Sequence, residues 1–166
     1  MANDANLGAL AEHRRGAGVG IDDLIYVSGN VGVGAGVITG GVQLEGTGEY
    51  AGEMGHLRFY ALGRLCHCGS LRCWETEVGA HAIAKAIGMS ESEVSHVEGV
   101  LESYDHASPE LRRTGTALGH GLAGIVNAFN PRLIVLGGYL SALYPLVRAE
   151  MDAALAERAL PARTRP

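Results

Sequence analysis

The chain has 166 residues, of which 47% are hydrophobic and 19% are charged, so it is long enough for one domain with a buried core and is too apolar to be disordered. Its formal net charge of -5 argues against a large basic face for nucleic acid on this segment. The sequence contains neither an apolar run long enough to cross a bilayer nor a secretory signal, so we expect a cytoplasmic protein without a membrane partner.

The first half of the chain predicts one helix followed by short strands and glycine turns. Asn3 or Asp4 can cap the helix, and the glycines from Gly16 onward end it. In chain order, we expect a helix over 3–15, a buried strand over 24–27, a glycine turn over 28–36, and a hairpin that pairs 37–39 with 42–44.

The second half predicts an irregular segment, then mostly helices with one strand. Ser90 and Glu93 form a capping-box pattern, Pro109 opens a long helix, and Asn130 with Pro131 ends that helix. We expect an irregular loop over 60–72, helices over 74–87, from 90, over 109–129 and over 145–159, a buried strand over 133–138, and a polar tail over 161–166. Because strands and helices alternate without a linker or a repeat, the sequence predicts a single α/β domain.

All three cysteines of the chain lie close together and follow a histidine. The pattern is His56, nine residues, Cys66, one residue, Cys68, four residues and Cys73. Zinc prefers four tetrahedral Cys and His ligands, and four protein ligands leave no open position for a catalytic water. The alternatives are free thiols beside an unrelated histidine, or a disulfide that leaves one thiol over. The spacing favours a structural Zn²⁺ ion.

Three acidic residues are candidates for binding a polar ligand. Glu53 precedes His56 by three residues and Glu75 follows Cys73 by two, so a metal would fix both carboxylates. Such a pair suits a ligand with several hydroxyls, most of all a sugar. Asp4 could remove a proton from a substrate hydroxyl, although an aspartate at a helix start is more often a simple cap. Glu53 and Glu75 could also be solvated surface charges.

Two glycine turns follow predicted strands, as phosphate-binding loops do. The first contains Gly32 and Gly34, and the second is Gly137 with Gly138. Neither continues as Gly-Lys-Ser/Thr, and alternate glycines more often mark a tight hairpin than a nucleotide site. They are therefore weak candidates for nucleotide-phosphate contacts.

Taken together, four segments resemble the ROK family of bacterial repressors, uncharacterised reading frames and sugar kinases. The segments are 3–6 (Asn-Asp-Ala-Asn), 52–56 (Gly-Glu-Met-Gly-His), 66–75 (Cys-His-Cys-Gly-Ser-Leu-Arg-Cys-Trp-Glu) and 130–138 (Asn-Pro-Arg-Leu-Ile-Val-Leu-Gly-Gly). The resemblance implies an actin-like, hexokinase-type ATPase fold of the ribonuclease H-like class. It also implies a sugar in the cleft between two lobes, and a homodimer.

The same resemblance implies roles for individual residues. Asn3, Asp4, Glu53, His56 and Glu75 match the sugar-contacting positions of the family. Asp4 would be the general base in kinase members. His56 would bind zinc through one ring nitrogen and face a sugar hydroxyl with the other.

The chain departs from the family pattern in several places. Asp4 stands at the start, whereas the family usually has a further lobe before this motif, and repressors have a winged helix-turn-helix before that. We therefore expect residues 1–166 to be the C-terminal sugar- and zinc-binding portion of a longer protein, with the family sequence continuing past Pro166. Val31 occupies the place of the phosphate-binding Thr of kinases, and Arg72 occupies the place of a Gly.

These features favour the sugar-sensing portion of a transcriptional regulator, which would reach DNA only through a region absent from this chain. Val31 offers no hydroxyl to a phosphate, while the predicted sugar and zinc residues are all present. The alternative is a sugar kinase that uses ATP and Mg²⁺, with Asp4 as the base. A segment that binds zinc and has no activity is the third possibility.

Overall fold

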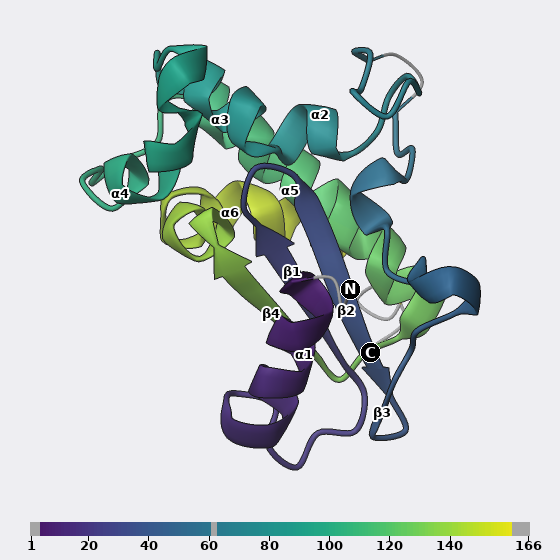
Figure 1. Ribbon diagram of the computed structural model, residues 1–166. Coiled ribbons are helices and arrows are strands. Elements are labelled where there is room, and N and C mark those ends of the chain that lie inside the picture. Colours follow the sequence, from purple (N-terminus) through teal and green to yellow (C-terminus); the bar gives the residue numbers. More distant parts are fainter. Residues whose placement is uncertain (1–3, 61–62, 161–166) are drawn as a thin grey trace.

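Helices and strands alternate along the chain in this computed structural model, which describes residues 4–60 and 63–160 (Figure 1). The helices and strands are α1 (Asp4–Arg15), β1 (Leu24–Gly29), β2 (Val33–Thr39), β3 (Val42–Gln43), α2 (Glu75–Val78), α3 (Ala80–Ala86), α4 (Val97–Leu101), α5 (Pro109–Phe129), β4 (Leu133–Gly138) and α6 (Tyr139–Arg158). Short 3₁₀ helices are η1 (Thr47–Glu49), η2 (Met54–His56) and η3 (Glu91–His96). The predicted α/β class is confirmed. None of the described helices is long and apolar enough to span a membrane.

The strands form one mixed sheet in the order β3-β2-β1-β4. β1 is antiparallel to β2 and parallel to β4, so the carboxyl ends of β1 and β4 meet at one edge of the sheet. At this edge Gly29 of β1 stands opposite both Val33 of β2 and Gly138 of β4. The turn between β1 and β2 therefore projects from the edge where ligands bind in open α/β sheets.

Helices lie on both faces of the sheet (Figure 1), and an apolar cluster fills each of the two layers between them. Leu24 and Ile38 face α1, where they pack with Ala9. Ile25 and Val27 point to the opposite face, into the main core that α5 and α6 cover. This alternation follows from the period of two along a strand. The result is a sheet with α1 on one face and the α5–α6 pair on the other.

The local sequence explains the bounds of the long helix α5. Its first turn contains Pro109, and the side chain of Ser108 accepts a hydrogen bond from the backbone N–H of Leu111 at 3.2 Å. At the other end, Asn130 adopts a left-handed conformation with φ 46° before Pro131. The predicted helix over 109–129 is confirmed.

The glycine turn predicted over 28–36 is wrong for most of that stretch. Residues 28–29 belong to β1 and residues 33–36 to β2, so the turn is confined to Asn30–Gly32. The reason lies in packing. A Cβ at Gly36 would collide with the carbonyl oxygen of Ala5 in α1, so this glycine lets the helix lie close to the strand.

Two predicted helices also have different bounds. The helix expected over 74–87 is broken at Gly79, which is extended with φ -71° and ψ 164°. The carbonyl of Val78 accepts a hydrogen bond from the hydroxyl of Tyr139 at 3.1 Å, a contact from the distant α6. The helix expected to start at Pro145 starts at Tyr139, and the proline lies inside α6, two residues before a non-helical Val147.

The strand predicted over 133–138 is correct in position but only partly buried. Residues 133–136 are half-buried, because β4 is an edge strand that pairs with β1 alone within the described residues. The hairpin of β2 and β3 and the capping box of Ser90 and Glu93 are confirmed, although the box starts the 3₁₀ helix η3. Asn3 and the tail predicted over 161–166 lie outside the described residues.

Candidate functional site

The cysteines lie on a loop that turns back on itself, which we call the cysteine loop (residues 63–73). Backbone hydrogen bonds close its tip. The N–H of Cys66 donates to Ser70 O at 2.8 Å, and the N–H of Gly69 donates to Cys66 O at 2.9 Å. Gly69 has φ 85°, a conformation that favours glycine. The loop is tied to the segment that follows η2 by an antiparallel bridge between Arg58 and Cys73.

The hydrogen bonds of the cysteine loop and its bridge to Arg58 bring the four predicted metal ligands together. One donor atom from each of His56, Cys66, Cys68 and Cys73 lies within 4.8 Å of the others. The Cys66 Sγ is 3.8 Å from His56 Nδ1, and the Cys68 Sγ is 3.6 Å from Cys73 Sγ. Neighbouring ligands of a tetrahedral zinc lie about 3.3 to 3.8 Å apart. The donor set and its spacing therefore fit a Zn²⁺ ion.

Burial sets the protonation of two of these thiols. It raises the pKa of Cys66, and it raises the pKa of Cys73 to about 12. The thiolate is the form that binds a metal, so a cation at this position would have to displace protons. No disulfide competes for these sulfurs, because all three cysteines are free.

Next to the cysteines lies a polar hollow of about 220 Å³, which we call the carboxylate hollow. Four predicted sugar residues line it, namely Asp4, Glu53, His56 and Glu75. Asp4 comes from the first turn of α1, Glu53 precedes η2, and Glu75 begins α2. The fifth predicted residue, Asn3, lies outside the described residues. Three separate segments thus direct carboxylates to one cavity.

Glu75 is the most firmly held of the three carboxylates. Its Oε2 accepts a hydrogen bond from the backbone N–H of Val33 at 2.9 Å, and its Oε1 lies 3.1 Å from His67 Nε2. Only 10% of its side chain is exposed. A Cβ at Gly32 would collide with Oε2 of Glu75, so the glycine makes room for this carboxylate.

His56 stands between the cysteines and the carboxylate hollow. Its Nδ1 faces the Cys66 sulfur, while its Nε2 is 4.0 Å from a carboxylate oxygen of Glu53. One imidazole therefore has one nitrogen toward the sulfur cluster and the other toward the acidic residues. This geometry suits a ring that is oriented by a metal on one side and contacts a ligand on the other.

The predicted nucleotide glycines are divided between two places. Gly32 and Gly34 line the carboxylate hollow, whereas Gly137 and Gly138 do not. Gly138 stands opposite Gly29 with φ 58°, and the Oδ1 of Asn30 is 3.1 Å from where its Cβ would be. The Asn30 amide therefore lies beside the glycine end of β4.

The sequence analysis missed three side chains that belong to this region. Ser28 and Asn30 line the carboxylate hollow, and His67 contacts Glu75. Ser28 sits within a strand, where nothing in the local pattern marks it as a site residue. His67 did carry a signal, because it stands between two cysteines of the proposed metal set.

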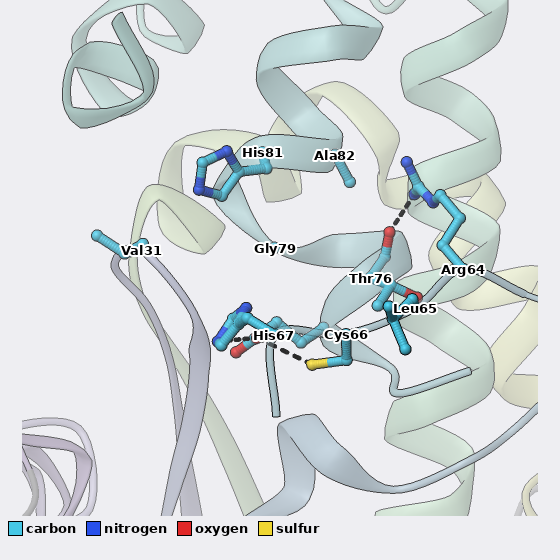
Figure 2. A pocket seen from close by; sticks show the side chains of 10 residues that line it. Val31, Arg64, Leu65, Cys66, His67, Thr76, Gly79, His81 and Ala82 are labelled. Carbon is cyan, nitrogen blue, oxygen red and sulfur yellow. Dashed lines mark hydrogen bonds and ion pairs between the residues drawn. The ribbon is translucent and has the colours of Figure 1, made fainter. Parts of the chain in front are cut away.

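A second pocket of about 390 Å³ adjoins the carboxylate hollow, with Glu75 lining both (Figure 2). Figure 2 shows the His67 and His81 rings on one side of this pocket and Arg64 on the other. The Arg64 guanidinium donates to the carbonyl of Thr76 and lies 3.5 Å from a carboxylate oxygen of Glu77.

Comparisons with known proteins find similarity to both repressors and glucokinases. The xylose repressor of Bacillus subtilis is 32% identical over 163 residues, which cover 95% of this chain and 42% of the repressor. Among solved structures, a ROK family glucokinase from Streptomyces griseus in complex with glucose and AMPPNP has a TM-score of 0.79 and 28% identity, with 100% of this chain and 60% of the kinase covered. A ROK family transcriptional regulator, described as a homolog of the Escherichia coli MLC protein, has a TM-score of 0.76 and 26% identity, with coverages of 96% and 44%.

These matches confirm the predicted actin-like ATPase fold. They also show that the chain spans less than half the length of the xylose repressor it matches. The model of the ROK family matches residues 1–165, almost the whole sequence. The chain belongs to the ROK family.

Proposed function

We propose that this chain is the sugar-binding part of a ROK-family transcriptional regulator, shaped by one structural zinc ion. The observation that carries the proposal is the convergence of Asp4, Glu53, His56 and Glu75 on one hollow beside the cysteines. Ionised carboxylates only accept hydrogen bonds, and a sugar offers several hydroxyl donors in a small volume. Asn3 joins this set on the strength of its motif.

His56, Cys66, Cys68 and Cys73 would hold the zinc ion. When bound, the ion cross-links the cysteine loop to η2 and orients the His56 ring. Cys73 is followed directly by Trp74, which is fully buried, and Glu75 comes next. A metal that fixes Cys73 would therefore also restrict the carboxylate of Glu75, two residues further along the chain. The protein's own contribution to sugar binding is the fixed position of these acceptors.

The regulator proposal is supported by the turn between β1 and β2. Phosphoryl transfer depends almost entirely on positioning and on stabilising phosphate charge. Val31 lies at the tip of this turn and is 60% exposed, and its hydrocarbon side chain offers a phosphate no hydrogen bond. Similarity to the xylose repressor also favours a regulator. DNA contacts would come from another part of the protein.

The second candidate function is a sugar kinase, and the position of Asp4 favours it. This carboxylate lines the carboxylate hollow, where it could accept a proton from a sugar hydroxyl. The similar glucokinase was solved with glucose and AMPPNP. In this case ATP and Mg²⁺ would be required, with phosphates near Gly32, Gly34, Gly137 and Gly138.

Calorimetry and a coupled assay together test both candidates. Zinc-loaded full-length protein is titrated with xylose, glucose and N-acetylglucosamine, and its sugar-dependent ATP consumption is measured. The proposal expects saturable heat with at least one sugar, lost in Glu53→Gln, and no sugar-dependent turnover. Robust turnover that disappears in Asp4→Asn would establish the kinase instead. A flat response to every sugar would contradict both candidates.

A further inference from the structure

A second group of potential metal ligands overlaps the first. The Cys66 sulfur, a ring nitrogen of His67 and a carboxylate oxygen of Glu75 lie within 4.8 Å of one another. Cys66 belongs to both groups. His67 and Glu75 belong only to the second and have no part in the four-residue set of His56, Cys66, Cys68 and Cys73.

The distances inside this second group match the edges of a coordination sphere. The Cys66 Sγ is 3.7 Å from Glu75 Oε1, and the same oxygen is 3.1 Å from His67 Nε2. Sulfur, nitrogen and oxygen ligands of one zinc ion are separated by about 3 to 4 Å. The three donor atoms therefore lie close enough together to share one ion after a small movement of the side chains.

The local charge also favours a cation here. A zinc ion bound by three thiolates and a neutral imidazole carries a net charge of about -1. Glu75 adds a further negative charge at the edge of that cluster, and Asp4 and Glu53 line the same hollow. With the first ion bound, the region therefore still carries a net negative charge, which favours a second cation.

Solvent reaches this position through the second pocket. Figure 2 shows the Cys66 sulfur and the His67 ring at the wall of this pocket of about 390 Å³. The side chain of His67 is 73% exposed, so it can move to complete a coordination sphere. Three protein ligands leave one position open, as in metal sites that exchange water.

From this geometry we propose that Cys66, His67 and Glu75 form a second, weaker site for a borderline-soft divalent cation such as Zn²⁺. The Cys66 thiolate bridges the two ions. The second ion binds more weakly because it shares one ligand and needs an exposed side chain to be ordered. If the proposed sugar site is correct, an ion on Glu75 competes with the sugar, and excess zinc weakens sugar binding.

Zinc stoichiometry tests the site without any sugar. Metal-free, reduced protein is dialysed against buffers of increasing free Zn²⁺, and bound zinc is measured by elemental analysis. Wild type should hold one ion at low free zinc and two at high free zinc. His67→Ala and Glu75→Gln should remain at one ion throughout. His81→Ala, which changes another histidine of the same pocket, should still reach two.

The outcomes separate this inference from the proposed function. A wild-type protein that stops at one ion, or a His67→Ala variant that still takes two, overturns the second site and leaves the structural zinc intact. A protein that binds no zinc overturns both. In a sugar titration, filling the second site should lower the apparent affinity in wild type but not in His67→Ala. An unchanged affinity in a wild-type protein that holds two ions would overturn the competition between the ion and the sugar for Glu75.

Discussion

Glu75 accepts a hydrogen bond from the backbone N–H of Val33, with 2.9 Å between Oε2 and the nitrogen. This contact joins the first residue of α2, two positions after the end of the cysteine loop, to the first residue of β2. It holds the carboxylate against the turn between β1 and β2 and at the wall of the carboxylate hollow. One side chain therefore connects the proposed metal centre, the sheet and the proposed sugar site.

Replacement of Glu75 should affect both stability and sugar binding. We expect Glu75→Ala to lower the free energy of unfolding by about 1–3 kcal/mol, because the Val33 N–H loses an ionised acceptor. Sugar affinity should fall by at least roughly tenfold, the equivalent of one charge-assisted hydrogen bond. Urea unfolding and calorimetry measure the two effects.

Glu77→Ala is the matched control for Glu75→Ala. It removes a carboxylate from the same short helix, but one whose partner is the half-exposed Arg64. Its cost should stay below about 1 kcal/mol, with sugar affinity unchanged. Equal effects of the two substitutions would show that the Val33 contact has no special role.

Removal of the metal should be visible in the fluorescence of the single tryptophan. Trp74 follows Cys73, is fully buried, and donates from its ring nitrogen to Ala117 O at 2.9 Å. Loss of zinc should loosen the cysteine loop, expose the indole and shift its emission to longer wavelength. Chelator treatment and Cys73→Ser should both produce this shift. If the emission and the unfolding midpoint stay constant after chelation, the structural role of zinc is refuted.

The backbone at Arg72 predicts a stabilising substitution. Arg72 has φ 70°, a left-handed conformation that favours glycine. Arg72→Gly should therefore raise the free energy of unfolding by about 1 kcal/mol, or the melting temperature by about 2–4 °C. Leu71→Gly, one residue earlier and without a positive φ, should lower stability by about 0.5–1 kcal/mol. A loss of stability in Arg72→Gly would mean that its side-chain contacts outweigh the backbone strain.

A partly buried histidine, His120, predicts how stability depends on pH. Burial lowers the pKa of His120, and the charge of Arg158 lowers it further, while Glu157 opposes the shift. The ring packs beside Tyr60, whose hydroxyl lies 3.3 Å from Nδ1. The unfolded chain therefore binds a proton more readily than the folded protein does. This stabilisation is present above pH 6.5, the ordinary histidine pKa, and is lost as the pH falls toward the folded pKa.

His120→Gln isolates this effect. The variant removes the titrating group but keeps a polar side chain, so its stability should fall less steeply than that of wild type between pH 7 and pH 5. Metal release at low pH would affect both proteins and cancels in the difference. The two stability curves, measured by denaturant unfolding, should therefore diverge below about pH 6.5. Parallel curves would argue against the lowered pKa.

The main elements of the fold were predictable because their signals are local. The apolar runs at 24–27 and 133–138 predicted β1 and β4. Pro109 and Asn130 predicted the two ends of α5. Other features depend on distant residues. The break at Gly79 is accompanied by a hydrogen bond from Tyr139, and Gly36 of β2 is explained by the approach of α1. Local propensity cannot report such contacts.

The candidate site was predictable where its residues are close in the sequence. Spacing alone grouped the three cysteines with His56, and the structure brings these four side chains together. The sequence could not show that the backbone of Val33 holds Glu75. The two residues are 42 positions apart, and the donor is a backbone N–H, which every residue type but proline has. Asn30 was missed as a lining residue for a similar reason, since its importance comes from where the sheet places the turn.

The close approach of α1 to β2 depends on the absence of a side chain at Gly36. Asp4 begins the helix that rests on this glycine, one residue before Ala5, whose carbonyl a Cβ at position 36 would strike. A single methyl group added at position 36 would therefore push α1 away from the sheet. The position of the Asp4 carboxylate in the carboxylate hollow therefore depends on Gly36, a residue that does not line the hollow.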